Sequence, residues 1–132
     1  MQLCSGLIYR DGKWEHDSKL SQCLVHAHPN TKLAAVCTEE ENSIPRSVRV
    51  YYQGRDEQIH EYVLSHGKWL HAVVTRGNPV CGTWLAATTV PVYKDSIVLF
   101  FQEKLTTSKL TKLTRIRSYY KSPSTQWTPG ES

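Results

Sequence analysis

Residues 48–62 read VRVYYQGRDEQIHEY, and the alternation of apolar and polar side chains in this stretch decides the fold class. In an extended strand, alternate residues of VRVYYQ point to opposite faces. Gly54-Arg55-Asp56 is a turn signal, and a second extended run follows it up to residue 62. The stretch therefore predicts a β-hairpin with Arg49 inside its first strand and Glu61 inside its second.

The first strand of this hairpin recurs later in the chain. VRVYYQ (48–53) matches IVLFFQ (97–102) in the character of every residue except one, where Val98 replaces Arg49. Internal repeats of this kind are the sequence signature of arrays and propellers. The match therefore predicts that the chain contains a repeated structural unit.

Two further landmarks recur in the same order. KLAAV (32–36) is matched by WLAAT (84–88), and turn-like segments precede Trp14, Trp69 and Trp127. The spacing is about 50 residues each time, which suits a repeat of four short strands. Each unit reads as a small-residue strand, a long alternating strand, a shorter strand, and a turn with its tryptophan.

Four strands in a repeat of this length predict a β-propeller blade. We expect a single all-β domain over residues 1–132, built from β-propeller-type four-stranded blades. Two full repeats cover approximately 15–69 and 70–127, and residues 1–14 contribute one terminal strand of a partial blade. A chain of this length is sufficient for one ordinary hydrophobic core.

Two blades cannot close a ring, and they leave sheet faces and edges uncovered. Identical chains in a cyclic arrangement would bury those surfaces. We therefore expect a homo-oligomer that completes a ring, with a trimer of six blades as the first hypothesis. The alternative is that the chain is a fragment of a longer propeller.

Composition excludes several classes of protein. Hydrophobic residues make up 39% of the chain and charged residues 21%, as in a globular protein and not a disordered one. The longest apolar runs, such as 97–101, are too short to span a membrane. No signal peptide is visible after Met1, which favours a cytoplasmic or non-classically secreted protein.

The cysteines and histidines predict no metal or cofactor. No cysteine pair has the two-residue spacing of a zinc site, so buried free thiols are expected, with disulfides left open as an alternative. His26 and His28 would share one strand face, but a third ligand would be needed. The four cysteines are Cys4, Cys23, Cys37 and Cys81.

The combination of VRVYYQ, IHE (59–61) and GKW (67–69), in this order, resembles the repeat of the fungal fucose-specific lectins, the Aleuria-type propeller family. The resemblance extends from about Leu7 to Trp127, and only the middle unit is near the full pattern. It implies a propeller that binds sugars between adjacent blades, without a metal.

By this resemblance, Arg49 and Glu61 would bind the hydroxyls and ring oxygen of a fucose-like sugar. The physical chemistry agrees, because a guanidinium offers a rigid fork of donors and a carboxylate accepts from two hydroxyls. The alternative is a cross-strand ion pair on a solvated face, which would contribute only about 0–1 kcal/mol.

The resemblance also implies an aromatic side chain from the neighbouring blade, packed on the apolar face of the sugar. Trp127 matches that position, with Tyr119 or Tyr120 nearby, and Trp69 is the corresponding aromatic of the middle unit. A core role for each tryptophan is the alternative. Trp84, outside this series, is expected to serve packing.

The last unit departs from the family pattern. Its arginine position is Val98, and its glutamate position falls at Leu110 or Lys112, depending on the gap chosen. The sequence therefore predicts one intact Arg–Glu pair per chain. Three other side chains are candidates for changing the sugar preference: Tyr51, Gln53 and His60.

Two alternatives to a lectin stay open, and an enzyme is not expected because only Glu61 is a candidate for the two carboxylates of a glycosidase. The segment 104–121 holds six basic residues and no acidic one, which suits nucleic acid or sulfated glycans. The other alternative is a non-sugar-binding propeller that serves as an interaction or effector protein.

Overall fold

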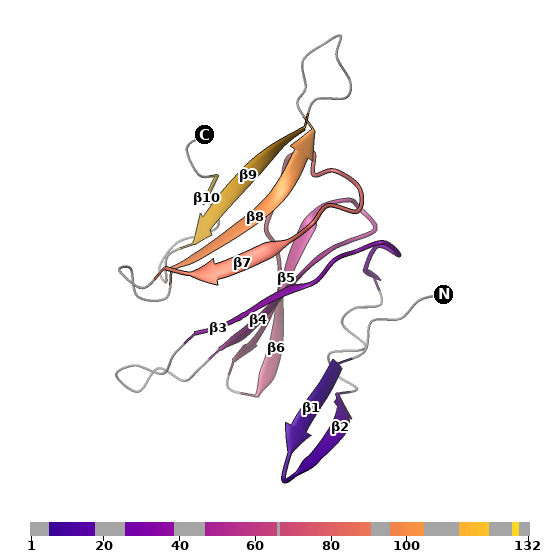
Figure 1. The fold of residues 1–132 in the computed structure, drawn as a ribbon, viewed down its shortest axis with the longest axis vertical. Helices are drawn as coiled ribbons and strands as arrows, with labels where there is room; N and C mark the ends of the chain where they lie inside the picture. The colour runs from indigo at the N-terminus through magenta and orange to yellow at the C-terminus, as the bar shows by residue number, and fades with distance from the viewer. Residues whose placement is uncertain are drawn as a thin grey trace.

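The computed structural model describes residues 6–17, 26–38, 47–65, 67–90, 96–104, 114–121 and 128–129 (Figure 1). All ten regular elements in these ranges are β-strands, in agreement with the predicted all-β class. They are β1 (Gly6–Arg10), β2 (Lys13–Asp17), β3 (Ala34–Cys37), β4 (Val48–Gln53), β5 (Ile59–Ser65), β6 (Lys68–Val73), β7 (Ala86–Thr89), β8 (Ile97–Lys104), β9 (Thr114–Lys121) and β10 (Thr128–Pro129).

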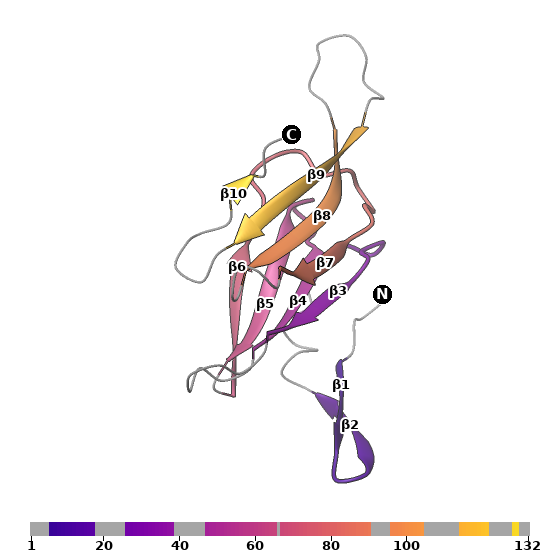
Figure 2. The same cartoon turned by 60° about the vertical axis from the view of Figure 1, so that its left-hand side comes forward.

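The strands form two antiparallel four-stranded sheets, and in each sheet consecutive strands are neighbours. The orders are β3-β4-β5-β6 and β7-β8-β9-β10 (Figures 1 and 2). An up-and-down sheet of four strands is the architecture of a propeller blade. The two predicted full repeats are therefore present, and we call these sheets blade 1 and blade 2.

The partial unit at the N-terminal end contains two strands, where the sequence predicted one. β1 pairs with β2 up to the closing pair Arg10 and Lys13. Asp11 and Gly12 between them have φ angles of 50° and 79°, as a type I′ hairpin turn requires. This hairpin extends away from the two blades in Figures 1 and 2.

The repeat is visible in the hydrogen bonds as well as in the sequence. The backbone N–H of Gln53 donates to Thr31 Oγ1 at 2.7 Å, and that of Gln102 donates to Thr83 Oγ1 at 2.8 Å. Each threonine thus fastens the segment before a blade's first strand to the end of its second strand. These two equivalent hydrogen bonds agree with the alignment of the repeats that the sequence match predicted.

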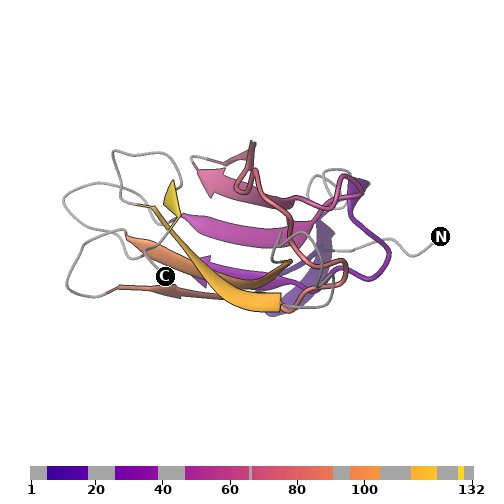
Figure 3. The same cartoon turned by 90° about the horizontal axis from the view of Figure 1, so that it is seen from above.

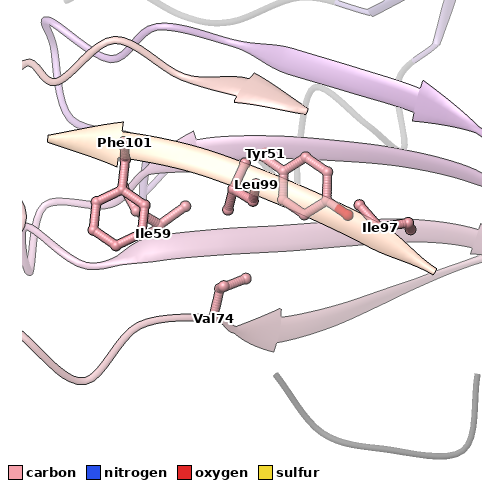
Figure 4. Close-up of a cluster of buried hydrophobic side chains, with 6 residues drawn as sticks. All are labelled: Tyr51, Ile59, Val74, Ile97, Leu99 and Phe101. Atoms are coloured by element: carbon pink, nitrogen blue, oxygen red, sulfur yellow. The ribbon is translucent and has the colours of Figure 1, made fainter. Parts of the chain in front are cut away.

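The hydrophobic core lies between the two blades and not within either one. Figure 3 shows the strands of the two blades from above. Alternate residues of β8 are buried against one face of blade 1, and β3 also approaches β7. Figure 4 shows the core side chains Tyr51, Ile59, Val74, Ile97, Leu99 and Phe101. Burial of each large apolar side chain contributes about 1.5–3 kcal/mol, so this interface holds the blades together.

The opposite face of blade 2 is left open by the described residues. Phe100, which alternates with the buried residues of β8, is 39% exposed.

Among the described residues, no helix is long and apolar enough to cross a membrane.

Candidate functional site

The structure brings Arg49 and Glu61 into direct contact on the face of blade 1 that packs toward blade 2. Arg49 Nη1 donates to Glu61 Oε2 at 3.0 Å. Tyr51 lies directly opposite Glu61 in the β4–β5 register, and its hydroxyl donates to the same oxygen at 2.9 Å. Strand alternation accounts for the grouping, since residues two apart on β4 share a face.

The pair does not lie on a solvated face, because the Glu61 side chain is only 1% exposed and that of Arg49 18%. A buried carboxylate is unfavourable unless it is paired and hydrogen-bonded. Arg49 and Tyr51 supply that pairing. Burial first, and then the charge of Glu61, raise the pKa of the Tyr51 hydroxyl far above its ordinary range, so it stays a donor.

Arg49 also has a donor that is not used. Its Nε atom is buried and has no hydrogen-bond partner among the residues that the structure describes. Buried donors in proteins are nearly always satisfied, and an unsatisfied one costs about 1–3 kcal/mol. Arg49 therefore carries an unsatisfied N–H beside a carboxylate that two donors hold.

Blade 2 lacks this charge pair. Val98 stands at the arginine position, as predicted. Glu61 lies opposite the fourth residue of VRVYYQ, and Ser118 lies opposite the fourth residue of IVLFFQ. The glutamate position is therefore Ser118, and the prediction of Leu110 or Lys112 was wrong. The β8–β9 connection is longer than the β4–β5 turn, so a gap chosen from the sequence ended too early.

Trp69 does not join the Arg49–Glu61 pair. It is half-buried on β6 opposite Leu64, which is an odd number of residues from Glu61 along β5. Strand alternation therefore places Trp69 on the opposite face of blade 1. Any sugar contact of Trp69 would belong to a site on that other face.

The other predicted aromatic residues are only partly covered by the structure. The backbones of Tyr119 and Tyr120 lie on β9, opposite Leu99 and Val98. Leu99 belongs to the core between the blades, so β9 passes close to the interface. Trp127 lies outside the described residues.

Only one of the three side chains expected to modify the pocket adjoins the pair, and that is Tyr51. Gln53 instead holds the connection between the blades: its Nε2 donates to Val80 O at 3.1 Å, and its Oε1 accepts from the Gly82 N–H at 2.7 Å. His60 lies on the opposite face from Glu61, its neighbour in β5.

On that opposite face the structure shows a hydrogen-bonded chain that the sequence analysis missed. His60 Nε2 lies 2.8 Å from Asp56 Oδ1, and His60 Nδ1 lies 2.8 Å from His71 Nε2. The spacing of four residues between Asp56 and His60 was visible, but the cross-strand position of His71 needed the β5–β6 register. Tyr52 stacks on the ring of His60, and the ring of Tyr62 packs against that of His71 in a tilted arrangement.

The hydrogen bonds and charges in this group of side chains shift two pKa values. Burial, and then the charge of His60, lower the pKa of His71. Burial acts to raise the pKa of Asp56, but hydrogen bonds from His60 and from the Gln58 N–H outweigh it and leave that pKa below its ordinary value. Within the described ranges, no group of three histidine, cysteine or acidic side chains is arranged to hold a metal.

Two expectations about burial were wrong. Cys37 and Cys81 are free thiols, but both are exposed, because one ends a short strand and the other occupies a turn. Trp84 is 72% exposed and does not serve the core; the Lys32 ammonium lies 5.2 Å from its ring centroid. Cys4 and Cys23 lie outside the described residues.

Comparison with known proteins identifies relatives, although no protein-family model matches the chain. A fucose-specific lectin of Aleuria aurantia is 38% identical over 91 residues, which are 67% of this chain and 28% of the relative. The crystal structure of the six-bladed Aleuria aurantia lectin matches with a TM-score of 0.71 and 29% identity, over 97% of this chain and 38% of the lectin.

Two further solved structures agree in fold. A variant of the Aleuria aurantia lectin in complex with α-methyl-L-fucoside has a TM-score of 0.69 and 27% identity, over 97% of this chain and 37% of the lectin. A mutant of AofleA from Arthrobotrys oligospora has a TM-score of 0.64 and 19% identity, over 93% of this chain and 33% of that protein.

The repeated sheets and the core between them define a partial β-propeller with a charged site between its blades. More narrowly, the chain belongs to the family of the Aleuria-type fucose-specific lectins, as its motifs indicated. It spans well under half the length of these relatives. These relatives are described as lectins, in agreement with the prediction that this chain is not an enzyme.

Proposed function

We propose that the chain is a carbohydrate-binding lectin that holds fucose-like glycans reversibly, without breaking a bond. The observation that carries the proposal is the buried Arg49–Glu61 contact at the interface of two blades, with an unused N–H on Arg49. The names of its relatives support a fucose-like ligand.

The chemistry of the pair suits a neutral sugar. Glu61 is held by Arg49 and Tyr51, so its orientation is set before a ligand arrives, and preorganisation lowers the entropic cost of binding. A ring oxygen or hydroxyl is the acceptor that Arg49 Nε lacks. A site built for particular hydroxyls rejects sugars that lack them, since its own polar groups would then be unpaired.

An aromatic side chain completes this proposal. The proposed residues are Trp127, Tyr119 and Tyr120 for the site at Arg49, and Trp69 for a site on the other face of blade 1. An aromatic ring adds apolar contact area to the C–H face of a sugar at small entropic cost.

We also propose that copies of the single 1–132 domain, with units near 15–69 and 70–127, associate through the open blade faces. Face-to-face packing of blades 1 and 2 shows the kind of contact that would be repeated, and a six-bladed ring of three copies is the first hypothesis. Several copies of one weak site would then act together.

The test is glycan-array binding at physiological salt, followed by calorimetry with L-fucose. Arg49→Lys keeps the charge but loses the fork, and Glu61→Gln keeps the shape but loses the charge. Each is expected to weaken binding by about 10- to 100-fold, since a hydrogen bond to a charged group contributes about 1.5–3 kcal/mol. Arg76→Lys, at an exposed arginine, is the matched control.

Thermal unfolding of every variant separates lost binding from lost folding. Fucose binding that survives both substitutions in folded protein would refute the proposed clamp. Binding confined to sulfated glycans or nucleic acid, and abolished by high salt, would refute the lectin proposal and point to the basic segment 104–121. None of the relatives supports nucleic-acid binding.

A further inference from the structure

An exposed thiol lies against an imidazole at the connection between the blades. Cys81 Sγ is 3.2 Å from His28 Nε2, although the two residues are far apart in the sequence. Neither side chain belongs to the Arg49–Glu61 pair. The thiolate and not the thiol is the nucleophilic form of cysteine, so the direction of this hydrogen bond decides what the pair can do.

The other ring nitrogen settles the direction. His28 Nδ1 accepts a hydrogen bond from the backbone N–H of Asn30 at 3.1 Å. In neutral imidazole one nitrogen accepts and the other carries the proton. The proton of His28 is therefore on Nε2, and it is donated to the sulfur of Cys81. A donor aimed at sulfur stabilises negative charge there.

Both residues are held by their backbones. The N–H of His28 donates to Gln53 O at 2.8 Å. Cys81 occupies a turn closed by the Thr83 N–H and the Val80 carbonyl at 3.0 Å, and Gly82 provides the positive φ of 73° that such a turn needs. These backbone hydrogen bonds fix the positions from which the two side chains meet.

Cys37 provides a natural contrast within the same chain. It is also a free and exposed thiol, but its Sγ is 3.7 Å from the carbonyl oxygen of Thr38. A carbonyl can only accept, so this contact favours the protonated thiol. Exposure is shared by the two cysteines, and the imidazole donor is what distinguishes Cys81.

We propose that Cys81 is a site of covalent modification by low-molecular-weight disulfides, activated by His28. The thiol proton leaves to solvent, and the sulfur of Cys81 attacks one sulfur of the disulfide. A new S–S bond forms as the old one breaks, and the departing thiolate takes a proton from solvent. Cys81 is oxidised to a mixed disulfide while one half of the reagent is reduced to a thiol. This chemistry does not depend on sugar binding.

The test measures the modification of each cysteine separately in the full chain by peptide mass spectrometry. The probes are iodoacetamide and glutathione disulfide at pH 7, in excess over protein. An unactivated thiol is only a few per cent thiolate at this pH, so Cys81 is expected to react about tenfold faster than Cys37 with each probe. His28→Phe should reduce the Cys81 rate to that of Cys37.

His28→Gln keeps an N–H donor near the sulfur and should restore part of the difference. The Cys37 rate serves as the internal control for folding, since it should be the same in all three proteins. Equal rates at the two cysteines in the unsubstituted chain would overturn the proposal. An unchanged Cys81 rate in His28→Phe would also overturn it.

Discussion

At the scale of single residues, Glu61 is the most deeply buried charged residue in the described structure. Its side chain is almost fully buried and accepts from both Arg49 and Tyr51. Removing one partner of a buried pair is costly because the remaining charge is left uncompensated. The same three residues therefore matter for stability as well as for the proposed binding.

Tyr51→Phe tests this role. The substitution keeps the ring in the core but removes the hydroxyl that donates to Glu61. We expect the free energy of unfolding to fall by about 1.5–3 kcal/mol, the range for a hydrogen bond to a charged group. Urea unfolding measures it. Tyr9→Phe, on the exposed hairpin, is the control, and an equal effect of the two substitutions would contradict the prediction.

The hydrogen bonds that connect Asp56, His60 and His71 lead us to expect a pH dependence of stability. The pKa of His71 is lowered in the folded protein from its ordinary value of 6.5, so the unfolded chain binds the proton more readily. Stability from this group is fully present above pH 6.5 and is lost as the pH falls through 6.5 toward the folded pKa. Urea unfolding from pH 7.5 to 5 should show this decline.

His71→Phe should flatten that decline, because it removes the titrating group while keeping a ring against Tyr62. Groups near His71 are His60, Asp56 and His26. The pKa of Asp56 is lowered, so its contribution is lost only as the pH falls below 3.8 toward its folded pKa, outside the tested window. An identical pH profile in the variant would disprove the role of His71.

At the scale of elements, Gln53 ties the end of β4 to the connection between the blades. Its side chain is fully buried and hydrogen-bonds the backbones of Glu57, Val80 and Gly82. Glu57 lies in the β4–β5 turn of blade 1, whereas Val80 and Gly82 lie in the segment that connects the two blades, so Gln53 links blade 1 to that connecting segment. Its contribution is separate from the apolar core.

Gln53→Ala should therefore destabilise the protein by about 2–4 kcal/mol, since it removes three hydrogen bonds made by a fully buried side chain. Gln102→Ala, at the equivalent position of blade 2, is the matched control and should have an effect below about 1 kcal/mol. Both free energies come from urea unfolding. A comparable loss in the two variants would show that the fastening role is misassigned.

Elements also show where sequence reasoning succeeded and failed. The alternation in residues 48–62 placed Arg49 and Glu61 on adjacent strands, because a short turn leaves only one sensible register. The β8–β9 connection is longer, so the sequence allowed several registers there. The glutamate position of blade 2 was therefore misplaced, and the observed register identifies it as Ser118. The contact of His60 with His71 was missed for another reason, since it depends on the β5–β6 register and on the diagonal placement of the two side chains on one face.

At the scale of the whole molecule, the open face of blade 2 is the surface on which association would depend. Phe100 is 39% exposed there, while its neighbours Leu99 and Phe101 are buried against blade 1. In protein interfaces, truncation of a central, well-packed side chain (a hot spot) typically costs about 2 kcal/mol or more of binding free energy. Phe100 is a candidate for such a role.

Phe100→Lys should therefore weaken self-association by about tenfold or more and leave thermal unfolding at low concentration unchanged. Light scattering after size-exclusion chromatography, over a range of concentrations, measures the association. Trp84→Lys, at an exposed aromatic elsewhere, is the control. Association that is unaffected by Phe100→Lys would show that copies meet through another surface.

The sequence by itself determined the strands, the repeat and the family, because strand alternation and recurring motifs are local properties that need no knowledge of distant contacts. Tertiary structure alone decided that Glu61 is buried, that Trp69 faces away from it, and that His28 meets Cys81. These features arise when faces of different strands and blades pack together. Packing brings together residues that are far apart in the chain, so no local pattern could have specified it.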